Sequence, residues 1–410
     1  MRILMHDYGG FPYPWQLART LAERGHSVEY IYNAAEPPRA TIQTAPEEQA
    51  RLTALGINLP KPLLKRSFVK RRAWEVQYGR TVGPEIDRFR PDVVISANTP
   101  LDSQVSLLRH TRRRGAKFVF WVQDLNSVAA YAILKERLSL LGALVGKHYI
   151  RLERSLLRQS DEVVLITEDF RNYTDRWGVP REKTHVIENW APIEQLPMLP
   201  RNNAWAKQHG LLDKICLLYA GTLGLKHNPE LLARLAQTLK CDPRVQIVTA
   251  AEGSGIPLLK QMKAEMRLDN LRIMPFQPFD ILPMVMASAD LLIAILEPSG
   301  SQYCVPSKVL TYLCSGRPLL LAVTPDNLIA RIVERHRAGL VVPPTDTDAF
   351  VKAAERLLHD KELRLQCGRN ARSYAEAHFN IDVIADRFEM LISQPSLCVA
   401  QPLSRAESVR

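Results

Sequence analysis

The sequence predicts an α/β protein of two doubly wound domains, each a parallel sheet with helices on both faces. Two observations lead to this prediction. Short apolar runs alternate with helical patterns, and this alternation stops in a Pro-rich stretch at 189–203 and then starts again. The chain has 410 residues, so each half is long enough to bury a core of its own. Two such domains face each other across a cleft, which is where we expect a ligand.

The first half of the chain contains six apolar runs of strand length. Helical patterns lie between several of them, at 15–23, 104–113 and 149–159. Strands separated by helices pair in parallel, which predicts one sheet for a first domain over residues 1–197. The expected strands are 2–5, 27–31, 92–96, 117–122, 162–166 and 184–187.

The second half repeats the alternation and adds helices after it. The expected strands are 215–219, 245–249, 271–274, 291–295, 319–323 and 340–342, and the expected helices are 229–239, 256–267, 347–359, 361–377 and 381–392. We expect a second domain over 198–378 and a helix at 379–393 that packs back on the first domain. Residues 394–410 show no periodicity, which predicts a disordered tail.

The composition is that of an ordinary globular protein. Hydrophobic residues make up 46% and charged residues 24% of the sequence, which excludes a disordered or fibrous protein. The six cysteines are scattered without a C-x-x-C pair, which argues against a zinc knuckle or a disulfide framework. The opening run 3–5 reads as a first strand and not as a signal peptide, and no apolar run approaches the ~20 residues of a membrane span. We therefore expect a soluble protein in the reducing cytoplasm.

Basic residues exceed acidic ones by 54 to 43, for a formal net charge of +11. Residues 61–90 hold nine Lys or Arg against three Asp or Glu, and a second basic run lies at 109–117. The stretch 131–158 mixes Leu-rich segments with Lys and Arg, a pattern typical of contact with an anionic membrane surface. Solvated basic faces and core-facing helices fit these segments equally well. Nucleic acid is not an expected partner, because no binding motif accompanies the charge.

Three loops in the second half have the composition of a phosphate-binding site. The loop 221–226 ends in a lysine and precedes a helix, 252–255 contains two glycines, and 306–308 opens a helix with a serine and a lysine. Loop amides and lysines at the carboxyl ends of parallel strands suit the charge of a diphosphate. Each loop alone is also compatible with an ordinary turn between a strand and a helix. Their occurrence together points to a nucleoside diphosphate.

In these motifs the sequence resembles the retaining GT-B glycosyltransferases of family four, in particular the bacterial enzymes that build O-antigen, capsule and colanic-acid-like polysaccharides. The resemblance covers nearly the whole chain. It implies a GT-B fold, in which two Rossmann-like domains face an interdomain cleft and bind the acceptor and the sugar nucleotide, respectively. The segments that carry it are 9–10, 24–28, 161–164, 186–190, 221–226 and 306–318.

For function, the resemblance implies transfer of a sugar from a nucleotide-diphosphate-sugar to an acceptor hydroxyl with retention of configuration. The donor would be UDP- or GDP-linked, without a cofactor, and the acceptor a glycan or polyprenyl-linked oligosaccharide of surface polysaccharide biosynthesis. The protein would lie in the cytoplasm or peripherally on the inner face of the cell membrane. Two alternatives stay open: a catalytically weak assembly or membrane-docking subunit, and a nucleotide-sugar epimerase, for which we find no matching acid–base set.

Carried over residue by residue, the resemblance also assigns a donor site. Lys226 would neutralise the diphosphate as a catalytic residue, the glycines of 252–255 would allow close approach, and the turn at 276–277 would contact the nucleobase. The chain departs from the family in having Tyr303 and Thr311 where two glutamates are common, and Thr222 in place of an arginine. The residues assigned to donor binding are Gly221, Thr222, Lys226, Gly253, Gly255, Phe276, Gln277, Ser307, Lys308 and Thr311.

The resemblance assigns acceptor binding to Gly9 and Gly10, in the loop after the first strand, and to Gln123, which with Asp124 follows the strand at 117–122. We expect Asp124 to act catalytically, by assisting deprotonation of the acceptor or by orienting the sugar. The alternative role of Asp124 is to cap the helix that follows.

The sequence Asp346-Thr347-Asp348 looks like the D-x-D metal motif of other glycosyltransferases. It follows a Pro-Pro turn and precedes a helix, so we predict that it caps that helix. We predict no essential metal, because lysines and backbone amides can stabilise a leaving diphosphate.

Overall fold

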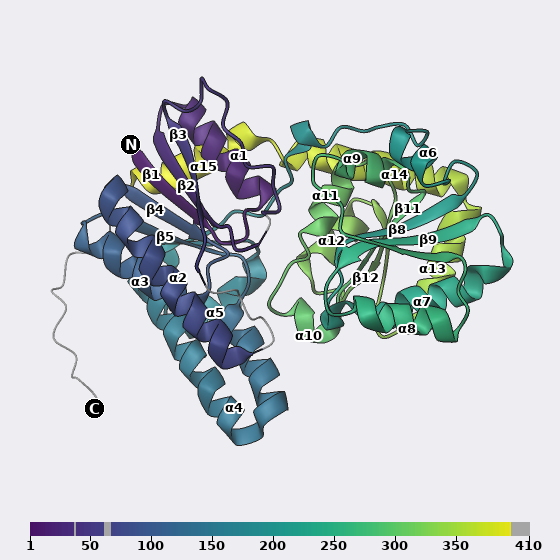
Figure 1. Cartoon of the computed structure of the whole chain (residues 1–410), viewed down its shortest axis with the longest axis horizontal. Helices are drawn as coiled ribbons and strands as arrows, with labels where there is room; N and C mark the ends of the chain where they lie inside the picture. The colour runs from purple at the N-terminus through teal and green to yellow at the C-terminus, as the bar shows by residue number, and fades with distance from the viewer. Residues whose placement is uncertain (37, 61–66, 395–410) are drawn as a thin grey trace.

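The computed structural model describes residues 1–36, 38–60 and 67–394, and these form two α/β domains that lie side by side (Figure 1). In the described part of the first domain, seven parallel strands pair in the order β3-β2-β1-β4-β5-β6-β7. The strands are β1 (Arg2–Asp7), β2 (Ser27–Asn33), β3 (Leu52–Ile57), β4 (Val93–Ala97), β5 (Lys117–Val122), β6 (Glu162–Leu165) and β7 (Thr184–Val186). The helices are α1 (Pro12–Glu23), α2 (Phe68–Phe89), α3 (Leu101–Arg113), α4 (Asn126–Gln159) and α5 (Arg171–Arg176).

The second domain has the same design, with six parallel strands among its residues in the order β10-β9-β8-β11-β12-β13. The strands are β8 (Ile215–Thr222), β9 (Val245–Glu252), β10 (Leu271–Met274), β11 (Leu291–Ile295), β12 (Leu319–Ala322) and β13 (Gly339–Val342). The helices are α6 (Ala204–Gln208), α7 (Pro229–Thr238), α8 (Ile256–Glu265), α9 (Leu282–Ala287), α10 (Pro298–Ser301), α11 (Lys308–Cys314), α12 (Leu328–Arg335), α13 (Thr347–His359) and α14 (Lys361–His378).

The central strands of both sheets are buried on both faces. Every residue of β5 and of β11 is buried, which is why these segments are nearly continuous apolar runs in the sequence. The strand order reverses at β1 in the first sheet and at β8 in the second. Ligands of doubly wound sheets bind beside such reversals, at the carboxyl ends of the strands. The α/β class with two doubly wound domains is therefore confirmed.

The structure contains several elements that the sequence did not predict, among them the strand β3 and the long helix α2. Among the described strands, β3 pairs with β2 and forms the edge of the sheet, and its residues Thr53 and Ala54 are exposed. An edge strand of this kind lacks the continuous apolar run by which the central strands were found. α2 is 22 residues long, but it is strongly basic and has Pro84 in its interior, both of which obscure a helical pattern.

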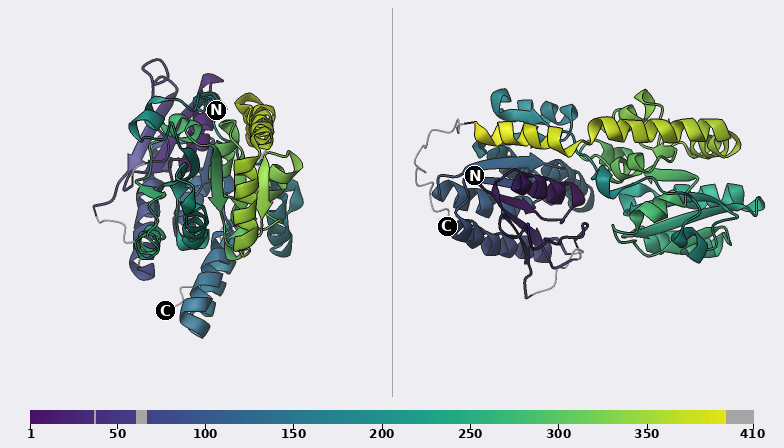
Figure 2. Two further views of the ribbon diagram at one scale, coloured as in Figure 1. Left: turned by 90° about the vertical axis from the view of Figure 1, so that its right-hand side faces the viewer. Right: turned by 90° about the horizontal axis from the view of Figure 1, so that it is seen from above.

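The helix α15 (Ile381–Ser393) returns from the second domain and lies against the first (Figure 2). The Arg24 guanidinium donates to the carboxylates of Asp386 and Glu389, both at 2.6 Å. The Lys117 ammonium donates to the Leu391 carbonyl at 2.7 Å, which ties the end of α15 to β5. The chain thus crosses between the domains twice, after β7 and before α15. Most of the expected disordered tail, 395–410, lies outside the described residues, as do Lys61, Lys65 and Arg66 of the basic stretch.

α4 is a helical hairpin that projects from the first domain (Figure 1). Ser139 has non-helical angles (φ 49°, ψ −121°) and divides the 34-residue element into two arms. The first arm begins at Asn126, directly after the loop that carries Asp124. In the part of the chain that the structure describes, we find no helix with the length and apolar composition that crossing a membrane requires.

Candidate active site

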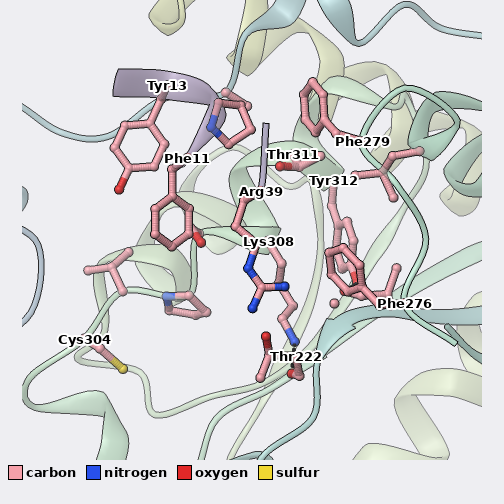
Figure 3. A pocket seen from close by; sticks show the side chains of 18 of the residues that line it. Phe11, Tyr13, Arg39, Thr222, Phe276, Phe279, Cys304, Lys308, Thr311 and Tyr312 are labelled. Carbon is pink, nitrogen blue, oxygen red and sulfur yellow. Dashed lines mark hydrogen bonds between the residues drawn. The ribbon is translucent and has the colours of Figure 1, made fainter. Parts of the chain in front are cut away.

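A cavity of about 350 Å³ lies between the domains, at the carboxyl ends of β1, β5 and β8 (Figure 3). Nine of the residues that the sequence assigned to the site line it: Asp124, Gly221, Thr222, Lys226, Phe276, Gln277, Ser307, Lys308 and Thr311. Five assigned residues do not line it: Gly9, Gly10, Gln123, Gly253 and Gly255. The lining also includes residues that the sequence reasoning missed, among them Phe11, Tyr13, Arg39, Trp190, His227, Cys304 and Tyr312.

Lys308 is the first residue of α11, and its side chain reaches the end of β8. There its Nζ donates to the Thr222 carbonyl at 2.9 Å and to the Tyr219 hydroxyl. The same Nζ is 3.9 Å from the centroid of the Tyr219 ring. Burial, and then the charge of Lys226, hold the pKa of Lys308 well below its usual value. An anion bound beside this amine would favour its charged form, so Lys308 is suited to respond to a phosphate.

Lys226 belongs to the 3-10 turn 225–227, and its Nζ lies 3.5 Å from the Cys304 Sγ. Burial on its own lowers the pKa of Lys226, but the neighbouring Cys304 and Asp124 outweigh burial and raise it. Burial raises the pKa of the Cys304 thiol to about 11, so the thiol is protonated at neutral pH. Lys226 is therefore a cation at neutral pH, as the neutralisation of a diphosphate requires.

His227 is a neutral hydrogen-bond donor beside these two lysines. Its side chain is buried, and its Nδ1 accepts from the Gly224 N–H at 2.9 Å, which leaves the ring proton on Nε2. Burial, and then the charges of Lys308 and Lys226, lower the pKa of His227 to about 3. The ring therefore adds a donor to the cavity without adding a charge.

Asp124 follows β5 and is partly exposed to the cavity. Burial raises its pKa to about 6, although the charge of Lys226 opposes this rise. The alternative role of Asp124 as a helix cap is wrong, because the N-cap residue of α4 is Leu125, which makes no side-chain capping bond. The Glu153 carboxylate instead accepts from the N–H and hydroxyl of Ser127, at 3.1 and 2.5 Å. A carboxylate with a pKa near 6 can take a proton at neutral pH.

Gly253 and Gly255 lie behind the cavity and bind two loops of the second domain to each other. A Cβ at either position would be 2.6 or 2.9 Å from the Leu223 carbonyl oxygen. The Gly255 N–H donates to that oxygen at 2.8 Å, and the Leu223 N–H donates to the Glu252 carbonyl at 2.7 Å. The chain therefore needs these glycines for its own close approach at this point. Their contact with a donor stays a prediction.

Gly9 and Gly10 likewise receive another segment of the chain. The Gly9 and Gly10 carbonyls accept from the N–H groups of Arg39 and Ala40, at 3.4 and 2.8 Å. Gly10 has a φ of +58°, and a Cβ there would be 2.7 Å from the Pro38 Cβ. The glycines thus hold the Arg39 segment at the cavity, and their direct contact with an acceptor stays a prediction.

Gln123 is buried and supports the first-domain side of the cavity from behind. Its Oε1 accepts from the Tyr13 hydroxyl at 2.9 Å and from the Asn189 side-chain amide at 2.5 Å. The Tyr13 ring packs edge-on against Trp190, with centroids 5.6 Å apart. Gln123 therefore orients the aromatic lining, and its contact with an acceptor also stays a prediction.

The positions that depart from the family differ in their surroundings. Thr311 lines the cavity, whereas the Tyr303 side chain is largely buried outside the lining. The Tyr303 carbonyl accepts from the Leu125 N–H at 3.0 Å, which connects the Asp124 loop to the second domain. In the turn assigned to the nucleobase, the Gln277 Oε1 accepts from the Trp205 indole N–H at 3.2 Å. Thr311 is therefore the residue of the replaced pair that can reach a donor.

Some of the missed residues lie next to motifs that the sequence analysis used, and Arg39 does not. Phe11 and Tyr13 come directly after the Gly-Gly loop, and Trp190 ends one of the segments that carry the family resemblance. His227 follows a residue already assigned to the site. Trp190 lies within such a segment, and the other three could have been found by extending the motifs by one to three residues. Arg39 had no comparable signal, because it lies in an irregular segment between two strands.

The acidic pair in the D-x-D sequence serves the helix that follows. Asp346 is the N-cap of α13, and its carboxylate accepts from the Ala349 N–H at 2.8 Å, so the capping prediction is confirmed. Among the described residues, no group of three or more His, Cys, Asp or Glu side chains is arranged to hold a metal ion.

Two family models together match most of the chain. The Glycosyl transferase 4-like domain matches residues 9–190, and Glycosyl transferases group 1 matches residues 202–374. The chain is 23% identical over 309 residues to the Escherichia coli colanic acid biosynthesis glycosyl transferase WcaI, covering 73% of this chain and 74% of that protein. It is 25% identical over 240 residues to an alpha-D-kanosaminyltransferase of Streptomyces kanamyceticus, covering 57% of this chain and 61% of that protein.

Solved structures share the fold across nearly the whole chain. HepE of Anabaena, in complex with UDP-glucose, has a TM-score of 0.71 at 15% identity and covers 96% of this chain and 99% of its own. A sucrose-phosphate synthase of Thermosynechococcus elongatus has a TM-score of 0.75 at 18% identity, covering 95% and 98%. These likenesses show the GT-B fold of two parallel-sheet domains, and the two family matches show that the chain belongs to the family-four glycosyltransferases.

Proposed function

We propose that this glycosyltransferase moves a sugar from a UDP- or GDP-linked sugar donor to an acceptor hydroxyl with retention of configuration. The observation that carries the proposal is the opposition of charges across one interdomain cavity. Lys226 and Lys308 line it from the second domain, and Asp124 lines it from the first. The Lys226 cation, and Lys308 once a phosphate favours its charged form, suit a leaving diphosphate. A carboxylate on the other side suits a hydroxyl that must lose its proton.

In the proposed reaction, the bond between the anomeric carbon and the diphosphate oxygen breaks. A bond from the same carbon to the acceptor oxygen forms on the same face of the sugar. The acceptor proton passes to the Asp124 carboxylate, while Lys226 and Lys308 balance the charge of the leaving diphosphate. Phe276 offers a ring face to the base, and the Thr311 hydroxyl offers a hydrogen bond to the ribose. UDP is the first nucleotide to test, because the solved structures of HepE contain UDP or UDP-glucose.

The α4 hairpin supports a second part of the proposal, a lipid-linked acceptor at an anionic membrane surface. Near its tip, Leu140 is 82% exposed and Leu141 and Leu144 are each 65% exposed. Lys135 and Lys147, both exposed, lie on either side of these leucines. Exposed leucines flanked by lysines suit insertion among anionic lipids. The first arm, 126–138, is about 18 Å long at 1.5 Å per residue, so the cavity would lie close to the bilayer.

A thermal-shift screen against UDP, GDP and their sugar derivatives tests the donor part. A ligand at 100 times its dissociation constant should raise the free energy of unfolding by about 2.7 kcal/mol. The anomeric configuration of the product, read by proton NMR, then tests retention. A well-folded protein that responds to none of these ligands would instead support the assembly-subunit alternative, which Thr222, Tyr303 and Thr311 favour.

Vesicle sedimentation tests the membrane part. We expect binding to phosphatidylglycerol vesicles and little binding to phosphatidylcholine vesicles. The triple variant L140S/L141S/L144S should weaken binding about 10-fold or more, because three leucines no longer leave water. L365S/V383S/M390S is the matched control, since these side chains are exposed elsewhere. Equal binding by both triple variants would contradict insertion of the hairpin.

A further inference from the structure

Arg39 belongs to the first domain, but its side chain reaches into the second. It lies between β2 and β3, and its Nη1 donates to the Glu252 carboxylate at 2.6 Å, at the end of β9. The centre of its guanidinium is 5.0 Å from the centroid of the Phe276 ring (Figure 3). Arg39 also lines the interdomain cavity. One guanidinium therefore contacts two elements of the opposite domain at the candidate active site.

The first domain holds the Arg39 backbone in place. The Gly9 and Gly10 carbonyls accept from the N–H groups of Arg39 and Ala40, and Ala40 is buried. The Asp7 carboxylate in turn accepts from the Gly9 N–H at 3.3 Å and the Phe11 N–H at 2.5 Å. The position of Arg39 is thus set by the loop after β1, so its cation moves with the first domain.

The partner of Arg39 adjoins the loop assigned to the diphosphate. Thr222 pairs with Glu252 in the register of β8 and β9, and Lys308 bonds to the Thr222 carbonyl. Among the described residues that line the cavity, Arg39 is the single arginine. Thr222 itself offers a hydroxyl and no charge. A planar guanidinium can bind two phosphate oxygens at once, which a lysine cannot.

The ion pair with Glu252 is readily exchanged. The Arg39 side chain is 30% exposed and the Glu252 side chain 50% exposed. Pairs this accessible to water contribute little to stability. A diphosphate carries more negative charge than one carboxylate, so it should compete well for the guanidinium.

We propose that Arg39 binds the donor diphosphate by exchanging Glu252 for phosphate oxygens. The first domain then supplies part of the donor site, and donor binding ties the two domains together. This inference rests on the proposed function, because it needs a nucleoside diphosphate in the cavity.

Isothermal titration with UDP, GDP and the matching nucleosides tests the inference. R39A should lower the affinity for the nucleoside diphosphate about 10- to 100-fold, the range for losing hydrogen bonds to a charged group. It should change the affinity for the nucleoside less than about 2-fold. R39K should recover part of the loss, because it restores a charge without the planar fork. E252Q should raise the affinity for the diphosphate about 2- to 5-fold, because a carboxylate that competes for Arg39 is removed.

R331A is the matched control. Arg331 pairs with Asp169 across the domains at 2.7 Å, with both side chains at least 42% exposed, and neither lines the cavity. The inference would be overturned if R39A and R331A lost diphosphate affinity equally. It would also be overturned if R39A lost as much affinity for the nucleoside as for the diphosphate. Weaker diphosphate binding by E252Q would overturn it as well, since it would make the pair a simple interdomain tie. Wild-type protein that binds no diphosphate would defeat the proposed function, whereas normal binding by R39A would defeat this inference alone.

Discussion

The two walls of the interdomain cavity are built in different ways. The second-domain wall comes from loops that follow strands and from the first turns of α11. Neighbours in the same domain hold its lysines, as Tyr219 and Thr222 hold Lys308. The first-domain wall collects side chains from four segments that are far apart in the sequence. Its main members are Phe11, Tyr13, Arg39, Asp124 and Trp190.

Buried polar groups with long-range partners hold the first-domain wall together. Gln123 supports Tyr13 from 110 residues away, and Glu153 supports the start of the helix after Asp124. The second-domain wall, proposed to bind the leaving group, is therefore encoded in local motifs, whereas the first-domain wall, proposed to meet the acceptor, depends on distant residues. Substitutions in the second-domain wall should mainly change catalysis, and substitutions behind the first-domain wall should also change stability.

The largest expected effect comes from Lys226→Ala in the second-domain wall. The pKa of Lys226 is raised, so the variant loses a cation proposed to lie beside the leaving diphosphate. This loss should reduce kcat/KM about 10³-fold, with little change in melting temperature. Steady-state kinetics with the donor that the screen identifies checks this. Lys240→Ala, at an exposed lysine of the same domain, is the control. A Lys226→Ala enzyme of normal activity would mean that this wall does not bind the diphosphate.

Asp124→Asn tests the opposite wall and should lower kcat about 10²-fold, as expected on losing a general base. The wild-type carboxyl has a pKa of about 6, raised by burial, and works in its deprotonated form. Wild-type kcat should therefore rise with pH and level off above about 6. The residual activity of Asp124→Asn should lack this rise. An unchanged pH profile in the variant would assign the proton to another group.

The same contrast decides how much of the site could be predicted from the sequence. Lys226 and Lys308 were found because a lysine in a glycine-containing loop and a Ser-Lys pair at the start of a helix are local patterns. Arg39 reaches the cavity on a segment that packs against Gly10 and bonds to the Gly9 and Gly10 carbonyls, and no local pattern reports these contacts. The sheets were predicted apart from β3, because buried parallel strands leave continuous apolar runs and an edge strand does not.

The glycines show a second limit of prediction. Gly253 and Gly255 do mark a close approach, but the group that approaches in the structure is the Leu223 carbonyl. A glycine in a sequence indicates that space is needed, and it does not identify the atom that uses the space. The same holds for Gly10 and Pro38.

Glu153→Gln probes the dependence of the first-domain wall on buried groups. Burial raises the pKa of Glu153 from 4.5 to about 7, so the folded state favours its protonated form. The stability that this provides is complete below about pH 4.5 and is lost as pH rises through about 7. Glutamine resembles the protonated acid and does not titrate. The variant should match wild type near pH 4.5 and exceed it by as much as about 3 kcal/mol at pH 8.

Urea unfolding at several pH values measures the stability difference between Glu153→Gln and wild type, in which all other titrating groups cancel. A difference that does not change with pH would show that the folded protein tolerates a charged Glu153. The first-domain wall would then not depend on the protonation of this residue.

Thr311→Val should have the smallest effect, because it removes one hydroxyl from the second-domain wall and keeps its shape. Losing a neutral hydrogen bond to the donor ribose should raise the dissociation constant of the nucleoside diphosphate about 5-fold. Thr345→Val, at an exposed threonine, is the control for the substitution itself. If a 2′,3′-dideoxy analogue of the nucleotide loses affinity equally for both Thr311→Val and wild type, Thr311 does not contact the ribose. The local wall would then hold the donor through its diphosphate and base alone.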